Sequence, residues 1–157
     1  MITERTTNAK CCGCCKDYGN TTINLKCDKN FAMNGDPIKI EGFIDNSRGN
    51  TDIDSGRVTL EERRILISSG GKIRYRYDQS HPIGTIKKVN AGGTEHFGFS
   101  SQIPFNIVNY TAIGSCTARY FLIAVYTEMG CCANSPYAEA HIIIHSKTPS
   151  IMKQQKI

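Results

Sequence analysis

The chain has 157 residues and a mass of 17.4 kDa, which suits a single domain with a core of its own. Its formal net charge of +5 at pH 7 permits anionic partners but does not indicate nucleic-acid binding. No apolar run approaches the roughly twenty residues that cross a bilayer, and the first residues lack the apolar region of a signal peptide. We therefore expect a cytoplasmic protein and leave peripheral contact with membranes open.

Two strands joined by a turn are predicted over residues 23–47. Between them, Asn34-Gly35-Asp36-Pro37 supplies residue types that favour a turn. On either side of the turn, apolar residues recur at every second position, the period of a half-buried strand. These residues are Ile23, Leu25, Cys27, Ile38, Ile40 and Ile44.

Further strands are expected at residues 58–68, 72–77, 83–89, 96–103, 116–128 and 137–145. In the first of these, Val58 and Leu60 occupy the opposite face from Ile65, which predicts a bulge near residues 61–64. Residues 116–128 are the most apolar and predict a central strand covered on both faces. The whole pattern predicts an all-β chain, folded as an immunoglobulin-like β-sandwich of about eight antiparallel strands.

Several short motifs then follow one another in a characteristic order. After a cysteine-rich start they are Ile23-x-Leu25, an aromatic Phe31 before Gly35-Asp36-Pro37-Ile38, Asp45-Asn46-Ser47, Glu61-Glu62-Arg63-Arg64, Gly92-Gly93, Ile103-Pro104 and Ser115-Cys116. This order resembles the C-terminal domain of arrestins, and most of all the α-arrestin (arrestin-domain-containing) branch, over about residues 12–149. The domain boundaries that follow are a polar, Cys-rich linker at 1–15, an arrestin C-terminal-like β-sandwich at 16–149 and a polar tail at 150–157.

The resemblance implies a non-enzymatic protein-interaction module, an adaptor or scaffold for membrane-protein trafficking or a component of a larger assembly. Its expected partners are other proteins, either membrane-receptor tails or assembly subunits. No Pro-Pro-x-Tyr motif for recruiting a ubiquitin ligase follows the domain, and no N-terminal arrestin domain is visible in the sequence. Phosphate sensing is therefore not carried over from the family.

The eight cysteines indicate a possible zinc site. Cys11-x-x-Cys14 and Cys12-x-x-Cys15 have zinc-knuckle spacing, and Cys131-Cys132 would complete four thiolates. In a sandwich of this kind the first strand often runs parallel to the last, which would bring the two cysteine groups together. The predicted ligands are Cys12, Cys15, Cys131 and Cys132. Two alternatives stay open, namely packing as small hydrophobic residues and reversible palmitoylation.

Basic residues on neighbouring strands form a second candidate site, made of Arg63, Arg64, Arg74, Arg76, Lys87 and Lys88, with Lys72 beside them. Such a patch would suit acidic lipid headgroups or a phosphorylated partner. The alternative is a solvated sheet face whose charges prevent aggregation, and it is favoured because Glu61 and Glu62 dilute the field. A zinc-stabilised domain that binds acidic lipid or nucleic acid through this face is the second functional hypothesis, although a nucleic-acid partner is not expected.

The four histidines, His81, His96, His141 and His145, are scattered along the chain. No nucleophile elbow, HExxH motif or phosphate-binding loop accompanies them. His141 and His145 share the parity of the expected solvent side of the last strand. The sequence therefore predicts a protein that is not an enzyme, with no cofactor other than a possible Zn²⁺.

Overall fold

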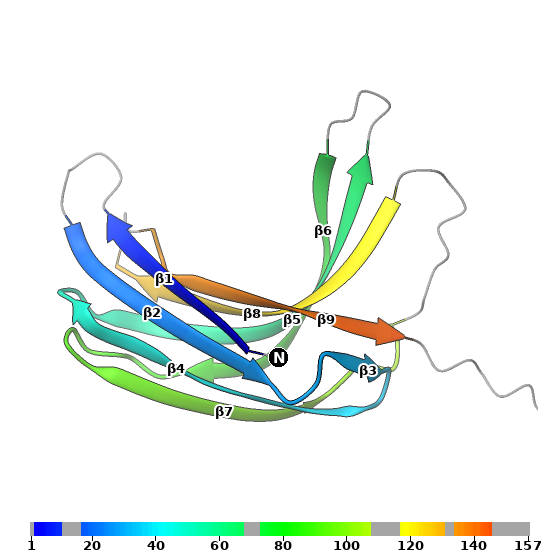
Figure 1. Cartoon of the computed structure of the whole chain (residues 1–157), viewed down its shortest axis with the longest axis horizontal. Coiled ribbons are helices and arrows are strands. Elements are labelled where there is room, and N and C mark those ends of the chain that lie inside the picture. Colours follow the sequence, from blue (N-terminus) through cyan, green and yellow to red (C-terminus); the bar gives the residue numbers. More distant parts are fainter. Residues whose placement is uncertain (1, 11–16, 68–72, 108–116, 131–133, 146–157) are drawn as a thin grey trace, which may run out of the picture.

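The computed structural model describes residues 2–10, 17–67, 73–107, 117–130 and 134–145, and only the backbone of residues 10, 64–67, 73–78 and 117–119 (Figure 1). Every regular element in this part of the chain is a strand. The strands are β1 (Ile2–Lys10), β2 (Asp17–Cys27), β3 (Phe31–Met33), β4 (Pro37–Gly49), β5 (Ile53–Ile67), β6 (Ile73–Ile86), β7 (Thr94–Gln102), β8 (Thr117–Met129) and β9 (Tyr137–His145). They form a four-stranded sheet, in the order β1-β2-β4-β7, and a five-stranded sheet, in the order β3-β9-β8-β5-β6.

The core lies between these two sheets. Each sheet contributes every second side chain to it, as the period-two pattern predicted. The largest fully buried side chains include Ile23, Leu25, Ile40 and Ile44 from the four-stranded sheet and Ile123 from the other. The predicted all-β sandwich is confirmed, and so is the position of Cys27 in the core, where it is 1% exposed.

The predicted strand pair at residues 23–47 is present as β2 and β4, which run antiparallel. Two glycines make it possible. Gly35 has a φ of 82° in the turn before β4, a conformation that L side chains avoid. At Gly42, an added Cβ would lie 2.0 Å from the backbone oxygen of Asn24 and 2.7 Å from the ring of Phe97, so only glycine permits this close approach.

A buried amide side chain stabilises the same strand pair at the end of β4 that is farther from the turn. Asn46 is fully buried, and its Oδ1 accepts a 2.8 Å hydrogen bond from Thr21 Oγ1 on β2. Its Nδ2 donates to the carbonyl oxygens of Thr51, at 2.9 Å, and Asn90, at 3.3 Å. A buried polar group is tolerated when its hydrogen-bonding capacity is used, and here it ties β2 and two loops to the end of β4.

Two strands occur where the sequence predicted none. Ile2–Lys10 was expected to be part of a polar linker, but it forms β1 and pairs antiparallel with β2. Its β-branched threonines favour an extended backbone, and as an edge strand it buries little, Ala9 being its buried hydrophobic residue. Phe31–Met33, which lies ahead of the turn, forms β3 and pairs in parallel with β9. The described strands are thus nine, and not all of their pairings are antiparallel.

The bulge predicted near residues 61–64 is confirmed, because the pairing of β5 with β6 shifts register between Glu62 and Arg63. The two strands predicted at 72–77 and 83–89 are instead a single strand, β6, which continues through the irregularity. The end of β5, the start of β6 and the start of β8 form a three-stranded ribbon that rises away from the sandwich (Figure 1). Within β8, residues 121–125 are all buried, as expected of a central strand.

Candidate interaction surface

Exposed apolar side chains gather around β3. The described residues include four exposed large hydrophobics, and three of them lie here: Phe31 is 49% exposed, Ile143 59% and Phe105 69%. Phe31 is the register partner of Ile143 on β9, and its ring centroid lies 5.4 Å from that of His145. We refer to Phe31, Phe105, Ile143 and His145 as the β3 edge cluster.

The alternation of β9 explains why Ile143 is exposed. Ala140, Ile142 and Ile144 enter the core, so His141, Ile143 and His145 must face outward. On β3, the core residue is Ala32, which leaves Phe31 on the outside.

Phe105 joins the cluster from the segment after β7. Its ring packs against Gly35, where an added Cβ would lie 2.4 Å from the ring. Its carbonyl oxygen accepts a hydrogen bond of 3.2 Å from Asn34 Nδ2. The cluster therefore combines two paired strands with a loop held in place by the turn before β4.

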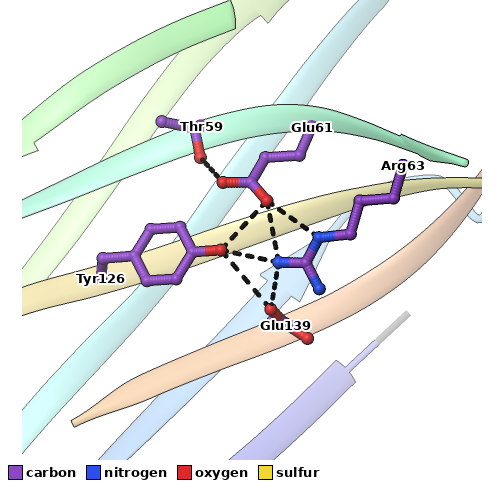
Figure 2. Close-up of polar contacts among 5 residues, drawn as sticks. All are labelled: Thr59, Glu61, Arg63, Tyr126 and Glu139. Carbon is purple, nitrogen blue, oxygen red and sulfur yellow. Dashed lines mark hydrogen bonds and ion pairs between the residues drawn. The ribbon is translucent and has the colours of Figure 1, made fainter. Parts of the chain in front are cut away.

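The outer face of the five-stranded sheet also carries a network of charged and polar side chains from three strands (Figure 2). On β5, the Arg63 guanidinium donates to Glu61 Oε2 through Nη2 at 2.9 Å and Nε at 3.2 Å. The same Nη2 lies 2.6 Å from Glu139 Oε1 on β9 and 2.8 Å from Tyr126 Oη on β8. Thr59 Oγ1 donates to Glu61 Oε1 at 3.2 Å. We refer to Thr59, Glu61, Arg63, Tyr126 and Glu139 as the outer-face network.

The outer-face network is largely removed from water. Glu61 is 3% exposed although it lies on the outer face, and Leu122 on the same face is fully buried. Burial lowers the pKa of the Arg63 guanidinium, but the hydrogen bonds to Glu139 and Glu61 and the charge of Glu139 outweigh it and hold that pKa above its ordinary value. Burial, with the charge of Glu61 and the hydrogen bond to it, raises the pKa of the Tyr126 phenol. Arg63 therefore stays charged and Tyr126 stays neutral, which preserves the hydrogen bonds that connect the three strands.

A cation–π contact connects the two sheets. The guanidinium of Arg5 on β1 lies 3.6 Å from the ring centroid of Tyr137 on β9, within the range of a favourable cation–π interaction. Because β1 belongs to the four-stranded sheet and β9 to the other, this contact links them along one side of the sandwich.

The predicted basic site divides into several parts in the structure. Arg63 belongs to the outer-face network. Lys87 and Lys88 are exposed, and Lys88 Nζ lies 2.6 Å from Asp52 Oδ2, whose hydrogen bond and charge raise the pKa of Lys88.

The remaining predicted arginines lie on the projecting ribbon. Arg64 is the register partner of Arg76 on β6 and of Arg119 on β8, and Arg74 lies two residues from Arg76. Three arginine positions thus stand side by side across three strands. Arg119 was absent from the predicted set because pairing of β5 with β8 is not visible in the sequence.

The predicted zinc ligands Cys12, Cys15, Cys131 and Cys132 lie outside the described residues, so the zinc site stays a prediction. Within the described part of the chain, no group of three or more His, Cys, Asp or Glu residues is placed to hold a metal ion. Histidines 96, 141 and 145 are exposed, and His141 packs its ring 5.3 Å from that of Tyr120. His81 is the exception, with its Nε2 buried and without a hydrogen-bond partner.

Comparison with known proteins identifies the fold. No family model matches the chain, and no curated protein matches its sequence. Among solved structures, the chain is similar to the crystal structure of Spo0M, a sporulation control protein from Bacillus subtilis, with 12% sequence identity and a TM-score of 0.56. The match covers 90% of this chain and 51% of Spo0M, so the chain spans about half the length of that protein.

The chain thus has a Spo0M/arrestin-like β-sandwich fold. Its assignment to the α-arrestin branch stays a prediction. In the described residues, no helix is long and apolar enough to span a membrane.

Removing Arg63 is expected to destabilise the protein. In Arg63→Met, the buried Glu61 carboxylate loses its charge partner, which costs about 3 kcal/mol of unfolding free energy, as for breaking a buried ion pair from one side. Because Glu61→Gln removes the orphaned charge, the double variant should recover part of the loss. Urea denaturation measures the unfolding free energy of the single and the double variant. The matched control is Arg57→Met on the same strand, whose exposed pair with Glu128 and contact of 5.3 Å with the ring of Tyr126 together contribute at most about 1 kcal/mol. Equal losses in the Arg63 and Arg57 variants would refute this role.

The raised pKa of Tyr126 predicts a loss of stability in alkali. Below the ordinary tyrosine pKa of about 10, the folded and unfolded states both hold the proton. Above it the unfolded state releases the proton first, so unfolding becomes easier as the pH rises. Between about pH 9 and pH 11, the wild type should therefore lose more unfolding free energy than Tyr126→Phe. Parallel curves for the two proteins in denaturant titrations would contradict the prediction.

Proposed function

We propose that this domain is a non-enzymatic protein-interaction module that docks a partner protein at the β3 edge cluster. The observation that carries the proposal is the pairing of exposed Phe31 with exposed Ile143 on β3 and β9, with exposed Phe105 at the turn that follows β3. Large apolar side chains that stay in water at adjacent positions are typical of binding surfaces. Aromatic anchors contribute strongly to protein interfaces.

The shape of the surface favours a protein over a small substrate. Phe31 and Ile143 are paired across two strands of a sheet and both side chains are exposed, so they offer an open apolar surface of the kind that contacts another protein. The charged groups Glu61, Arg63 and Glu139 engage one another on the outer face of the same sheet, which supports a structural role for them.

We further propose a cytoplasmic adaptor or assembly component, with a membrane-receptor tail or another assembly subunit as partner. The arrestin-like fold supports a module of this type. Spo0M, which shares the fold, is described as a sporulation control protein, and regulation of that kind is compatible with a domain that works by binding.

The test is to weaken the cluster and measure binding. The wild type should capture partner proteins from a native extract, and the Phe31→Ser/Ile143→Ser variant should lose them. The control variant Ile2→Ser removes an exposed hydrophobic residue of β1 and should still capture them. With a purified partner, calorimetry should give a loss in affinity on the order of tenfold or more, as for truncated apolar anchors. Unchanged affinity of the Phe31/Ile143 double variant would refute docking at this surface.

A second candidate function is binding to an acidic lipid surface through the projecting ribbon, with a zinc-bound cysteine cluster as an added support. The observation that favours it is the register of Arg64 with Arg76 and Arg119. Arginine positions that stand side by side raise the local positive potential, which attracts anionic headgroups.

Vesicle sedimentation tests this second function. The wild type should bind vesicles that contain phosphatidylserine more strongly than neutral vesicles, and added salt should weaken the binding because it screens exposed charges. Arg64→Gln/Arg76→Gln should reduce binding several-fold. Lys39→Gln/Arg48→Gln removes the same charge from exposed positions of β4 and should have a smaller effect. Equal loss in both variants would show that only net charge matters.

A further inference from the structure

The outer face of the four-stranded sheet carries straight rows of side chains, because outward residues of β1, β2, β4 and β7 stand side by side in register. The aromatic ring of Phe43 lies in the middle of this face. Its own row is Glu4, Asn24, Phe43 and His96, and the rows on either side are Ile2, Lys26, Glu41 and Gly98, and Thr6, Thr22, Asp45 and Thr94. Phe43 is thus an aromatic residue among mostly polar neighbours.

Two hollows adjoin at the half-buried ring of Phe43. One has a volume of about 410 Å³ and extends from Phe43 and His96 to Gly98. The other has a volume of about 300 Å³ and extends from Phe43 to Thr22 and Thr6. The ring centroids of Phe43 and His96 lie 5.7 Å apart. Together the hollows cross the sheet from β7 to β1, with an aromatic pair on the way.

The larger hollow is left open by the missing side chain of Gly98. This residue lies in an unbroken run of register pairs between β4 and β7, and its φ is not positive. A Cβ added to it would meet no atom within 4 Å. The fold therefore does not require glycine here, although glycine weakens a strand. With a bulge and a tight internal contact excluded, the remaining reason for such a glycine is the close approach of a ligand to the backbone.

The charges of this surface favour a neutral ligand. Among the described residues that line the two hollows, the carboxylates of Glu4, Glu41 and Asp45 face the cations Lys26 and Arg48. Lys26 is already paired, because its Nζ lies 2.6 Å from Glu41 Oε1. A nucleic acid would bring its phosphates to these carboxylates. A purely apolar compound would leave the polar lining without partners.

We propose that this face binds a neutral polysaccharide chain of glucose-type rings, with one ring stacked on Phe43. A pyranose ring with equatorial hydroxyls presents C–H groups on its two faces and hydroxyls around its rim. The C–H groups are attracted to the negative face of an aromatic ring. Hydroxyls both donate and accept, so they can pair with hydroxyl, amide and carboxylate groups such as those of Thr22, Asn24 and Asp45. The hollow over Gly98 provides room for a neighbouring sugar unit. The site and the β3 edge cluster lie on different sheets, so the proposal does not depend on the proposed function.

The probes are cellohexaose and maltohexaose, two neutral glucose hexamers that differ in chain shape, and the control ligand is a uridine hexanucleotide. Titration followed by backbone amide NMR should give saturable shifts at Phe43, His96 and Gly98 with at least one of the sugars. The amides of Phe31 and Ile143 should stay in place. Absence of shifts with both sugars, or shifts with the nucleotide alone, overturns the proposal.

Variants of Gly98 test the hollow. Gly98→Val fills it without displacing a neighbour, and valine favours strands. Its denaturation midpoint should therefore not fall, whereas its affinity for the sugar should drop on the order of tenfold or more, as for the loss of a central contact. The matched control is Ser100→Val, which adds the same side chain at the next outward position of β7, outside both hollows, and should bind as the wild type does.

Variants of Phe43 test the stacking. Phe43→Ala should lose affinity to a similar extent, whereas Phe43→Tyr, which keeps the aromatic ring, should retain it. The amide spectrum of each variant reports whether it is folded. Full sugar affinity in Gly98→Val or in Phe43→Ala would overturn the proposal.

Discussion

Burial of alternate apolar side chains between two sheets is the interaction on which the rest of this structure depends. Ile23, Leu25 and Ile44 on one sheet meet residues such as Leu60 and Ile123 on the other, and each strand can serve this core with only one of its faces. The opposite face of every strand is thereby fixed as well. This constraint places Phe31 and Ile143 in water and brings Thr59, Glu61 and Arg63 to a common outer surface.

The period-two pattern explains why much of the fold could be predicted from the sequence. Strong apolar alternation specified β2 and β4, and the unbroken apolar run of β8 specified a central strand. The change of phase between Leu60 and Ile65 located the bulge near Arg63. β1 and β3 escaped prediction for the same physical reason, because an edge strand buries few side chains. β1 is held by backbone pairing with β2, and β3 by three residue pairs with β9, which leave little trace in composition.

The surface was harder to predict than the core, because its chemistry depends on which strands are neighbours. Glu61 and Glu62 were interpreted as solvated charges that dilute a basic patch, yet each is 3% exposed. Glu61 and Arg63 are two positions apart, so the sequence already indicated that they share one face of the strand. Their partners Tyr126 and Glu139 lie more than sixty residues away, and only the order β9-β8-β5 brings them together.

The outer face of the five-stranded sheet is therefore divided into two regions with opposite requirements. In the outer-face network, Arg63 satisfies Glu61 and Glu139 from within the domain, and a partner that displaced it would expose two carboxylates to each other. At the β3 edge cluster, Phe31 and Ile143 contribute favourable free energy only when a partner removes them from water. The same sheet thus stabilises itself across β5, β8 and the start of β9. It leaves exposed apolar area at the end of β9, where Ile143 and its register partner Phe31 both face outward.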